Sequence, residues 1–169
     1  MADRKDDEKG DTCNLDNLKN KFEKLREKYD LPEFYELNKL FDIEDVDSDS
    51  DFLLRRVRRT IAERISGYSR FVDVILNPSN APVFFFNLLK KVDNKDKEII
   101  AGVYEIVGNI ELEMMGLDLE YSEKKEAEFI KMIVDVFDKK IRPIFLEFLK
   151  KMGNHNGLEV KKESRSYFG

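Results

Sequence analysis

Apolar residues recur at steps of three and four positions along most of this chain, the spacing that places side chains on one face of an α-helix. The first stripe of this kind contains Leu15, Leu18, Phe22, Leu25 and Tyr29. The next stripe is short and contains Phe34, Leu37 and Phe41. We expect a helix over each. Asp30 is the predicted N-cap of the second, because Pro32 suits a first turn and Glu33 completes a capping box.

Three longer stripes predict the main helices of the chain. One contains Leu54, Val57, Ile61, Ile65, Tyr68, Val72 and Ile75. Another contains Ile99, Val103, Ile106, Val107, Ile110, Met114 and Leu117. The last contains Ile130, Ile133, Phe137, Ile141, Ile144, Phe148 and Met152 and stops at Gly153. Pro143 lies inside this last stripe, and we expect a kink there, because proline lacks an amide hydrogen and its ring clashes with the preceding turn.

These stripes predict an all-α protein, an irregular bundle of five to six helices. No run of alternating polar and apolar residues is long enough to predict a strand. The 169 residues have the size of one ordinary domain, which we place at 14–153. Residues 1–13 are polar, and residues 154–169 are rich in charged and turn-forming types. We therefore expect a disordered leader and a flexible C-terminal tail.

The composition excludes several kinds of binding site for this chain. The formal net charge of −5 disfavours generic phosphate binding. The single cysteine, Cys13, and the single histidine, His155, leave no disulfide framework and no paired-histidine metal site within one chain. No segment approaches about 18 unbroken apolar residues, and the N-terminal stretch lacks the apolar core of a secretory signal. We expect a cytoplasmic protein that uses no metal, no cofactor and no membrane.

The acidic segment 44–51 resembles a calcium loop only in part. Asp45, Asp47, Asp49 and Asp51 alternate as EF-hand ligands do, but Ser50 replaces the required glycine and Arg56 the closing glutamate. We therefore interpret the segment as the start of a helix, with Ser48 or Ser50 as its N-cap. Phosphorylation of Ser48 is a further hypothesis, since added negative charge at a helix start could pair with Arg55 or Arg56.

The helix that follows is rich in arginine and suggests a nucleic-acid surface. The candidate residues are Arg55, Arg56, Arg59 and Arg70. Glu63 and Asp73 share the polar face with them, whereas a phosphate-binding face normally keeps its cations apart from carboxylates. Nucleic-acid binding through the Arg55–Arg70 helix is therefore the alternative interpretation.

Two segments carry more apolar residues than a bundle core needs. Over 80–92 we expect a short helix capped by Ser79 or Asn80, on which Phe84, Phe85 and Phe86 point in three directions. Either neighbouring helices bury all three rings, or one ring remains outside as an anchor for a partner.

The second such segment is helix 96–117, which has a second stripe beside its main face. That stripe contains Ala101, Glu105, Gly108, Leu112 and Met115. Its small residues would allow another backbone to approach closely, although a central position in the bundle would explain them equally well.

We find no catalytic constellation. The carboxylate pairs Glu111 with Glu113 and Glu123 with Glu126 are interpreted as surface charge, and a carboxylate-dependent enzyme is the remote alternative. The excess apolar residues favour a helical protein–protein interaction or scaffold module, a subunit of a larger assembly that binds a protein partner or itself. We expect no enzymatic activity.

Overall fold

Helices form where the apolar stripes predict them, and the computed structural model, which describes residues 7–82 and 85–153, is an all-α bundle. The longer helices are α1 (Asp7–Tyr29), α3 (Leu53–Leu76), α5 (Asn94–Leu119), α6 (Glu123–Val136) and α7 (Arg142–Gly153). The shorter elements are α2 (Phe34–Phe41), α4 (Phe86–Leu89), the 3₁₀ turns η1 (Ile43–Asp45) and η2 (Pro78–Asn80), and the π-helical turn η4 (Phe137–Ile141). No described residue lies in a strand.

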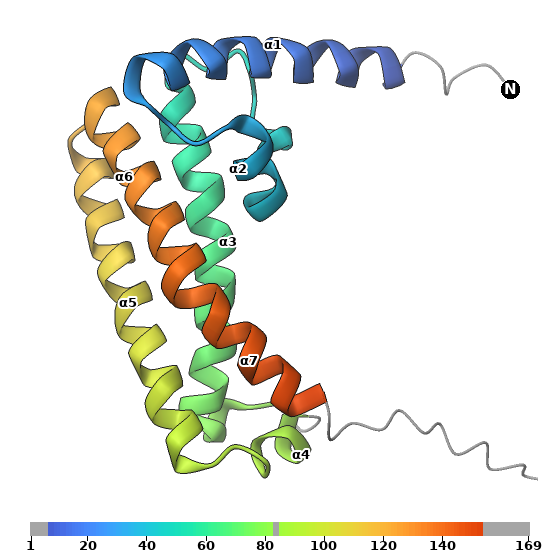
Figure 1. Cartoon of the computed structure of the whole chain (residues 1–169), viewed down its shortest axis with the longest axis vertical. Helices are drawn as coiled ribbons and strands as arrows, with labels where there is room; N and C mark the ends of the chain where they lie inside the picture. The colour runs from blue at the N-terminus through green and yellow to red at the C-terminus, as the bar shows by residue number, and fades with distance from the viewer. Residues whose placement is uncertain (1–6, 83–84, 154–169) are drawn as a thin grey trace, which may run out of the picture.

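Three long helices run side by side and form the body of the molecule (Figure 1). α3 packs against both α5 and α6, and α7 continues the path of α6 beyond the π-helical turn. α1 lies across one end of this bundle, with α2 packed between α1 and α3 (Figure 1). α4 lies at the opposite end, between α3 and α5 along the chain. No helix in the described part of the chain has the length and apolar content needed to cross a membrane.

The core lies along α3, where the faces of four other helices meet. Its fully buried members include Leu18 and Phe22 from α1, Leu37 from α2, Val57, Ile61 and Ile65 from α3, Ile100 and Val103 from α5, and Ile130 and Ile133 from α6. A row of aromatic rings extends it toward α7, with neighbouring ring centroids 5.0–6.3 Å apart: Phe41, Phe137, Tyr68, Phe145, Phe71 and Phe148. Burial of these stripes is what holds the helices together.

The π-helical turn lies just before Pro143 and joins α6 to α7. Within it the amide of Arg142 donates to the carbonyl of Phe137, a step of five residues in place of the usual four. The wider turn holds one extra residue, so the apolar stripe resumes on α7 with Phe145, Phe148 and Met152 buried. α7 leans away from the axis of α6 (Figure 1), as expected for a helix interrupted at a proline.

Two boundaries at the N-terminal end differ from the sequence prediction. α1 begins at Asp7, inside the stretch predicted to be a disordered leader, because a helix once nucleated extends at little cost per residue. Asp30 is not the N-cap of α2. Its φ of 54° is left-handed, and the amide of Leu31 donates to the carbonyl of Arg26, so Asp30 terminates α1. The N-cap of α2 is Glu33.

The segment 80–92 does not form the predicted helix. Its described residues contain only the four-residue α4, and neither Ser79 nor Asn80 caps it, since both belong to the preceding 3₁₀ turn. Pro82 accounts for the failure of the predicted caps. It forces Ala81 into an extended conformation (φ −73°, ψ 134°), which prevents a helix from starting before the proline.

Candidate functional site

The face of α5 that points away from the bundle is apolar and exposed. The side chains of Tyr104, Leu112, Met115 and Leu119 are 47%, 67%, 63% and 90% exposed. They lie opposite the buried residues Ile100, Val103, Val107, Ile110 and Leu117. Together with Ala101, Glu105 and Gly108, these four residues form one stripe along the helix that we call the outward face of α5.

Within the described residues, nothing packs against the small members of this face. A Cβ added at Gly108 would meet no atom within 4 Å, and the same holds for Gly102 and Gly116. The alternative explanation of the glycines, a central position in the bundle, is therefore wrong. α5 buries only one side, mainly against α3 and also against α6 and α7, and the other side faces solvent.

The sequence prediction of this face was incomplete. Glu105 is exposed in the stripe as predicted, whereas Tyr104 and Leu119 were missed although they continue its spacing. Ile99 was assigned to the buried side but is 43% exposed, while its neighbour Ile100 is fully buried. One helical step of 100° separates these two residues, so the predicted face was rotated by one position at this end.

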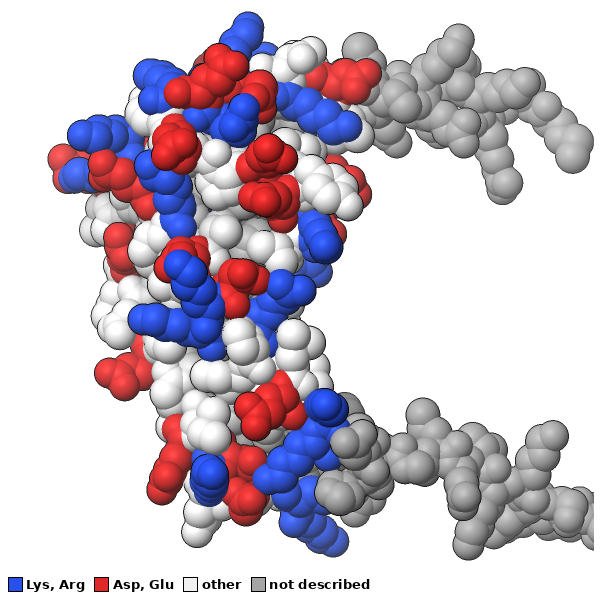
Figure 2. All heavy atoms as spheres, in the orientation of Figure 1, with Lys and Arg blue, Asp and Glu red and all other residues white. Residues whose placement is uncertain are grey.

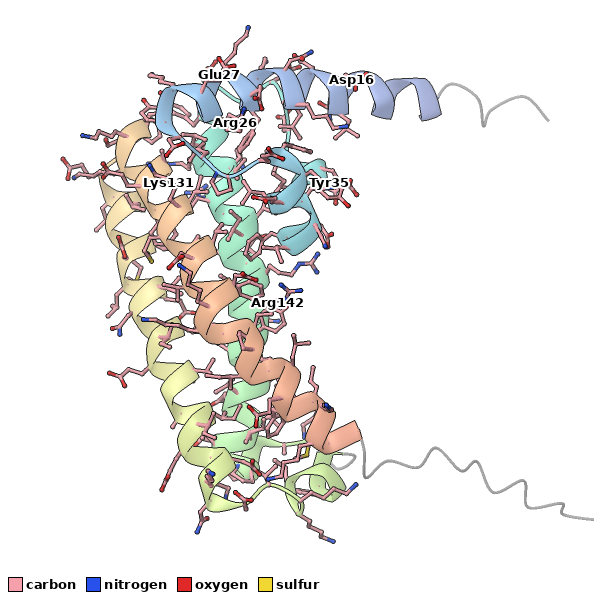
Figure 3. The ribbon with its side chains drawn as sticks, in the orientation of Figure 1. Asp16, Arg26, Glu27, Tyr35, Lys131 and Arg142 are labelled. Atoms are coloured by element: carbon pink, nitrogen blue, oxygen red, sulfur yellow. The ribbon has the colours of Figure 1, made fainter. Side chains whose placement is uncertain are left out.

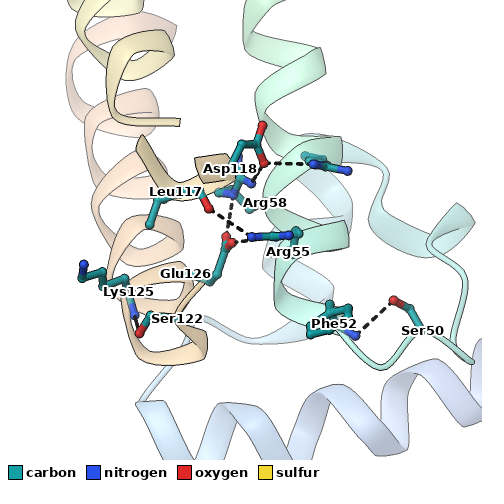
Figure 4. A network of polar contacts seen from close by, with 10 residues as sticks. Ser50, Phe52, Arg55, Arg58, Leu117, Asp118, Ser122, Lys125 and Glu126 are labelled. Atoms are coloured by element: carbon teal, nitrogen blue, oxygen red, sulfur yellow. Dashed lines mark hydrogen bonds and ion pairs between the residues drawn. The ribbon is translucent and has the colours of Figure 1, made fainter. Parts of the chain in front are cut away.

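A second polar feature lies where α3, α5 and α6 meet, around Arg58 (Figure 4). Arg58 and Glu126 are both fully buried, and the Arg58 Nε donates to a carboxylate oxygen of Glu126. The Arg58 Nη2 donates to Asp118 at 2.6 Å, and Arg59 Nη2 donates to the same carboxylate oxygen at 3.0 Å. Arg55 donates to Glu126 at 3.4 Å and to the Leu117 carbonyl at 3.1 Å. This network ties three helices together.

Sequence reasoning missed this network. Glu126 was interpreted as surface charge, which is wrong, because its side chain is fully buried beneath the arginines. Arg58 was not among the candidate residues, and burial of a whole guanidinium is rare without a partner. Nothing in the local spacing identifies the partner, since Arg58 and Glu126 are 68 positions apart.

The network and its surroundings shift the pKa values of two carboxylates. Burial opposes ionisation of Asp118, but hydrogen bonds from Arg58 and Arg59 outweigh it and lower the pKa of Asp118 below its usual value. At the start of α6, hydrogen bonds from Lys28 and Tyr29 lower the pKa of Glu123. Both carboxylates favour the folded state only while they are ionised.

We predict that the protein loses stability in acid. A carboxylate whose pKa is lowered on folding contributes stability above its unfolded pKa, and this contribution disappears as the pH falls through the folded pKa. For Asp118 and Glu123 the unfolded values are 3.8 and 4.5. The urea midpoint should therefore stay level from neutral pH to about pH 5 and fall below that. Asp118→Asn should flatten the acid limb, whereas Asp51→Asn, at an exposed position, should leave it unchanged.

The arginines proposed to bind nucleic acid are only partly accessible. Arg55 and Arg59 are engaged by Glu126 and Asp118, whereas Arg56 and Arg70 are exposed. The Arg55 guanidinium also lies over the Tyr121 ring, 4.7 Å from its centroid. Basic and acidic side chains are interspersed over the face seen in Figure 2. The arrangement is that of intramolecular ion pairs, which weighs against the nucleic-acid hypothesis.

The three consecutive phenylalanines have different environments. Phe85 is half-buried and lies 6.3 Å from the Phe71 ring, while Phe86 is 43% exposed. Phe84 lies outside the described residues. The hypothesis that one of these rings anchors a partner stays a prediction, with Phe86 as the exposed candidate.

The acidic segment is a turn that packs beside α1. Ser48 is 2% exposed and accepts a hydrogen bond from Asn17, so it is poorly placed for phosphorylation. The prediction that Ser48 or Ser50 is the N-cap of α3 is wrong. The N-cap is Phe52, whose amide donates to the Ser50 hydroxyl in the preceding turn. Among the described residues, no three histidine, cysteine, aspartate or glutamate side chains are grouped as a metal site requires.

The outward face of α5 is therefore the feature of the described structure that packing leaves unexplained, whereas the arginine network already has its partners within the chain. Comparisons with family models, with curated proteins and with solved structures find no match to this chain.

Proposed function

We propose that this chain is a helical protein–protein interaction module that acts as a subunit of a larger assembly, and that it binds through the outward face of α5. One observation carries the proposal: four large apolar residues along this one face of α5 are 47–90% exposed. Single exposed apolar residues are ordinary, but a contiguous apolar patch is characteristic of an interaction site.

The energetics of the face support the same proposal. Covering apolar surface is worth about 25 cal/mol per Å², so a face with several large side chains gains from a partner. Tyr104 and Met115 also supply an aromatic ring and a flexible thioether, groups of the kinds that bind well at interfaces. The charged side chains beside the face would form the polar rim that such interfaces usually have.

A photocrosslinking amino acid placed at position 112 in the native host tests the proposal. We expect discrete crosslinked products, because Leu112 is 67% exposed at the centre of the face. The same amino acid at position 139 is the control, since the Lys139 side chain is 70% exposed on the π-helical turn, outside the face. Equal yields of products at both positions, or none at position 112, would contradict the proposal.

A further inference from the structure

We propose that the partner of the outward face of α5 is a second copy of this chain, whose α5 packs antiparallel against the first about a twofold axis level with Ile110. This inference rests on the proposed function, since it names the partner of the same surface. The face is self-complementary in size and in charge, and each property supports the antiparallel arrangement independently.

The first argument is the order of small and large residues. In an antiparallel pair with twofold symmetry, positions at equal distances before and after the axis face each other. Gly108 and Leu112 each lie two positions from Ile110, and Ala101 and Leu119 each lie nine positions from it. Each leucine of one copy thus meets a small residue of the other. Glu105 and Met115 each lie five positions from it, and Tyr104, at six, lies one position further out, so the Met115 thioether of one copy meets the Glu105 side chain and the Tyr104 ring of the other.

The structure leaves room for this packing. A Cβ at Gly108 would have no atom within 4 Å. Leu112 and Leu119, which would pack over Gly108 and Ala101 of the other copy, are 67% and 90% exposed. Small residues at a helix contact allow the two axes to approach to about 8 Å. From Ala101 to Leu119 the face is about 27 Å long, at 1.5 Å per residue, so the contact would extend over five turns.

The second argument is charge. The basic residues of α5 are Lys95 and Lys97, both in its first turn, and the segment 98–123 contains acidic residues but no basic one. A parallel pair would therefore place two acidic halves side by side. The antiparallel pair places Lys97 of each copy near Glu120 of the other, while Asp118 stays engaged by Arg58 and Arg59 of its own chain. Glu111 lies beside the axis, but its carboxylate accepts a hydrogen bond from Ser66 of α3 and is thereby held toward its own bundle.

Replacement of one glycine tests the packing with a matched control. We expect the full chain to be a dimer by sedimentation equilibrium and Gly108→Leu to be a monomer, because the leucine fills the notch that Leu112 of the second copy would occupy. Gly102→Leu should remain a dimer, since Gly102 is also helical and open but lies about 120° around the helix from Gly108. Neither leucine should unfold the monomer, because a Cβ has space at both positions.

Disulfide crosslinking tests the direction of the pair. With Cys13→Ser as the background, chains carrying Ala101→Cys and chains carrying Leu119→Cys are mixed and oxidised. We expect a crosslinked dimer from the mixture and very little from either chain alone, because only an antiparallel pair brings position 101 of one copy to position 119 of the other.

A monomeric full chain at all concentrations tested, a dimeric Gly108→Leu variant, or efficient crosslinking of Ala101→Cys with itself would each overturn the inference. These outcomes are distinguishable from failure of the proposed function. A monomeric protein that still crosslinks at position 112 to a different protein in the native host would retain the interaction role and reject only the second copy as partner.

Discussion

Glu126→Ala is expected to lower the free energy of unfolding by about 3–5 kcal/mol, because it leaves the charge of Arg58 buried without its main partner. Arg58 and Glu126 are both fully buried, and the remaining partner of Arg58, Asp118, lies at the edge of the network with 42% of its side chain exposed. Urea unfolding followed by circular dichroism measures the loss. Glu128→Ala is the control, since Glu128 lies on the same helix with 58% of its side chain exposed.

A double variant separates the cost of a stranded charge from the value of the ion pair. Arg58→Met combined with Glu126→Leu should be clearly more stable than Glu126→Ala, because two apolar side chains of similar volume need no hydrogen-bond partners. The Nη1 of Arg58 is buried without a hydrogen-bond partner among the described residues. Replacing Arg58 with methionine therefore also removes the free-energy cost of this unpaired donor. A double variant as unstable as Glu126→Ala would show that the network stabilises the fold beyond neutralising charge.

Phe41→Ala is expected to lower the free energy of unfolding by about 3–5 kcal/mol, the usual effect of removing a buried ring. Phe41 is 1% exposed, and its ring centroid lies 5.0 Å from that of Phe137, so it joins α2 to the junction of α6 and α7. If α2 belongs to the same cooperative unit as the bundle, the whole unfolding curve shifts and remains a single transition.

Tyr35→Ala provides the matched control on the same helix. Tyr35 is 73% exposed and its side chain points away from the bundle (Figure 3), so we expect a change within about 0.5 kcal/mol. A loss for Phe41→Ala as small as that for Tyr35→Ala would mean that α2 is only loosely attached to the rest of the molecule.

The helices that could be predicted from the sequence are those whose stripes are long and regular. The stripe from Leu54 to Ile75 predicts α3 almost to its ends, because period and burial agree along the whole helix. The caps predicted for segment 80–92 were wrong because Pro82 favours an extended conformation at Ala81, so that a helix cannot start at Ser79 or Asn80. The prediction that Asp30 is an N-cap was wrong because aspartate is favoured both before a helix and in the left-handed turn after one, and the sequence does not distinguish these two positions.

The candidate site was only partly predictable for a different reason. Gly108, Leu112 and Met115 follow a helical period, so a second stripe on α5 was visible without coordinates. Whether another helix covers that stripe depends on the packing of the whole bundle. The pairing of Arg58 with Glu126 could not be predicted for the same reason. It joins α3 to α6 across 68 positions, and no local sequence pattern indicates it.

Because of the π-helical turn, the fold depends on the number of residues between Val136 and Arg142. Surface loops absorb the gain or loss of a residue, but this extra residue lies inside a continuous helical rod. The turn already holds one extra residue, and a further residue inserted into Phe137–Ile141 would rotate everything after it by about 100°. Phe145, Phe148 and Met152 would then turn out of the core together. A protein sharing this architecture can therefore vary the identity of these five residues more easily than their number.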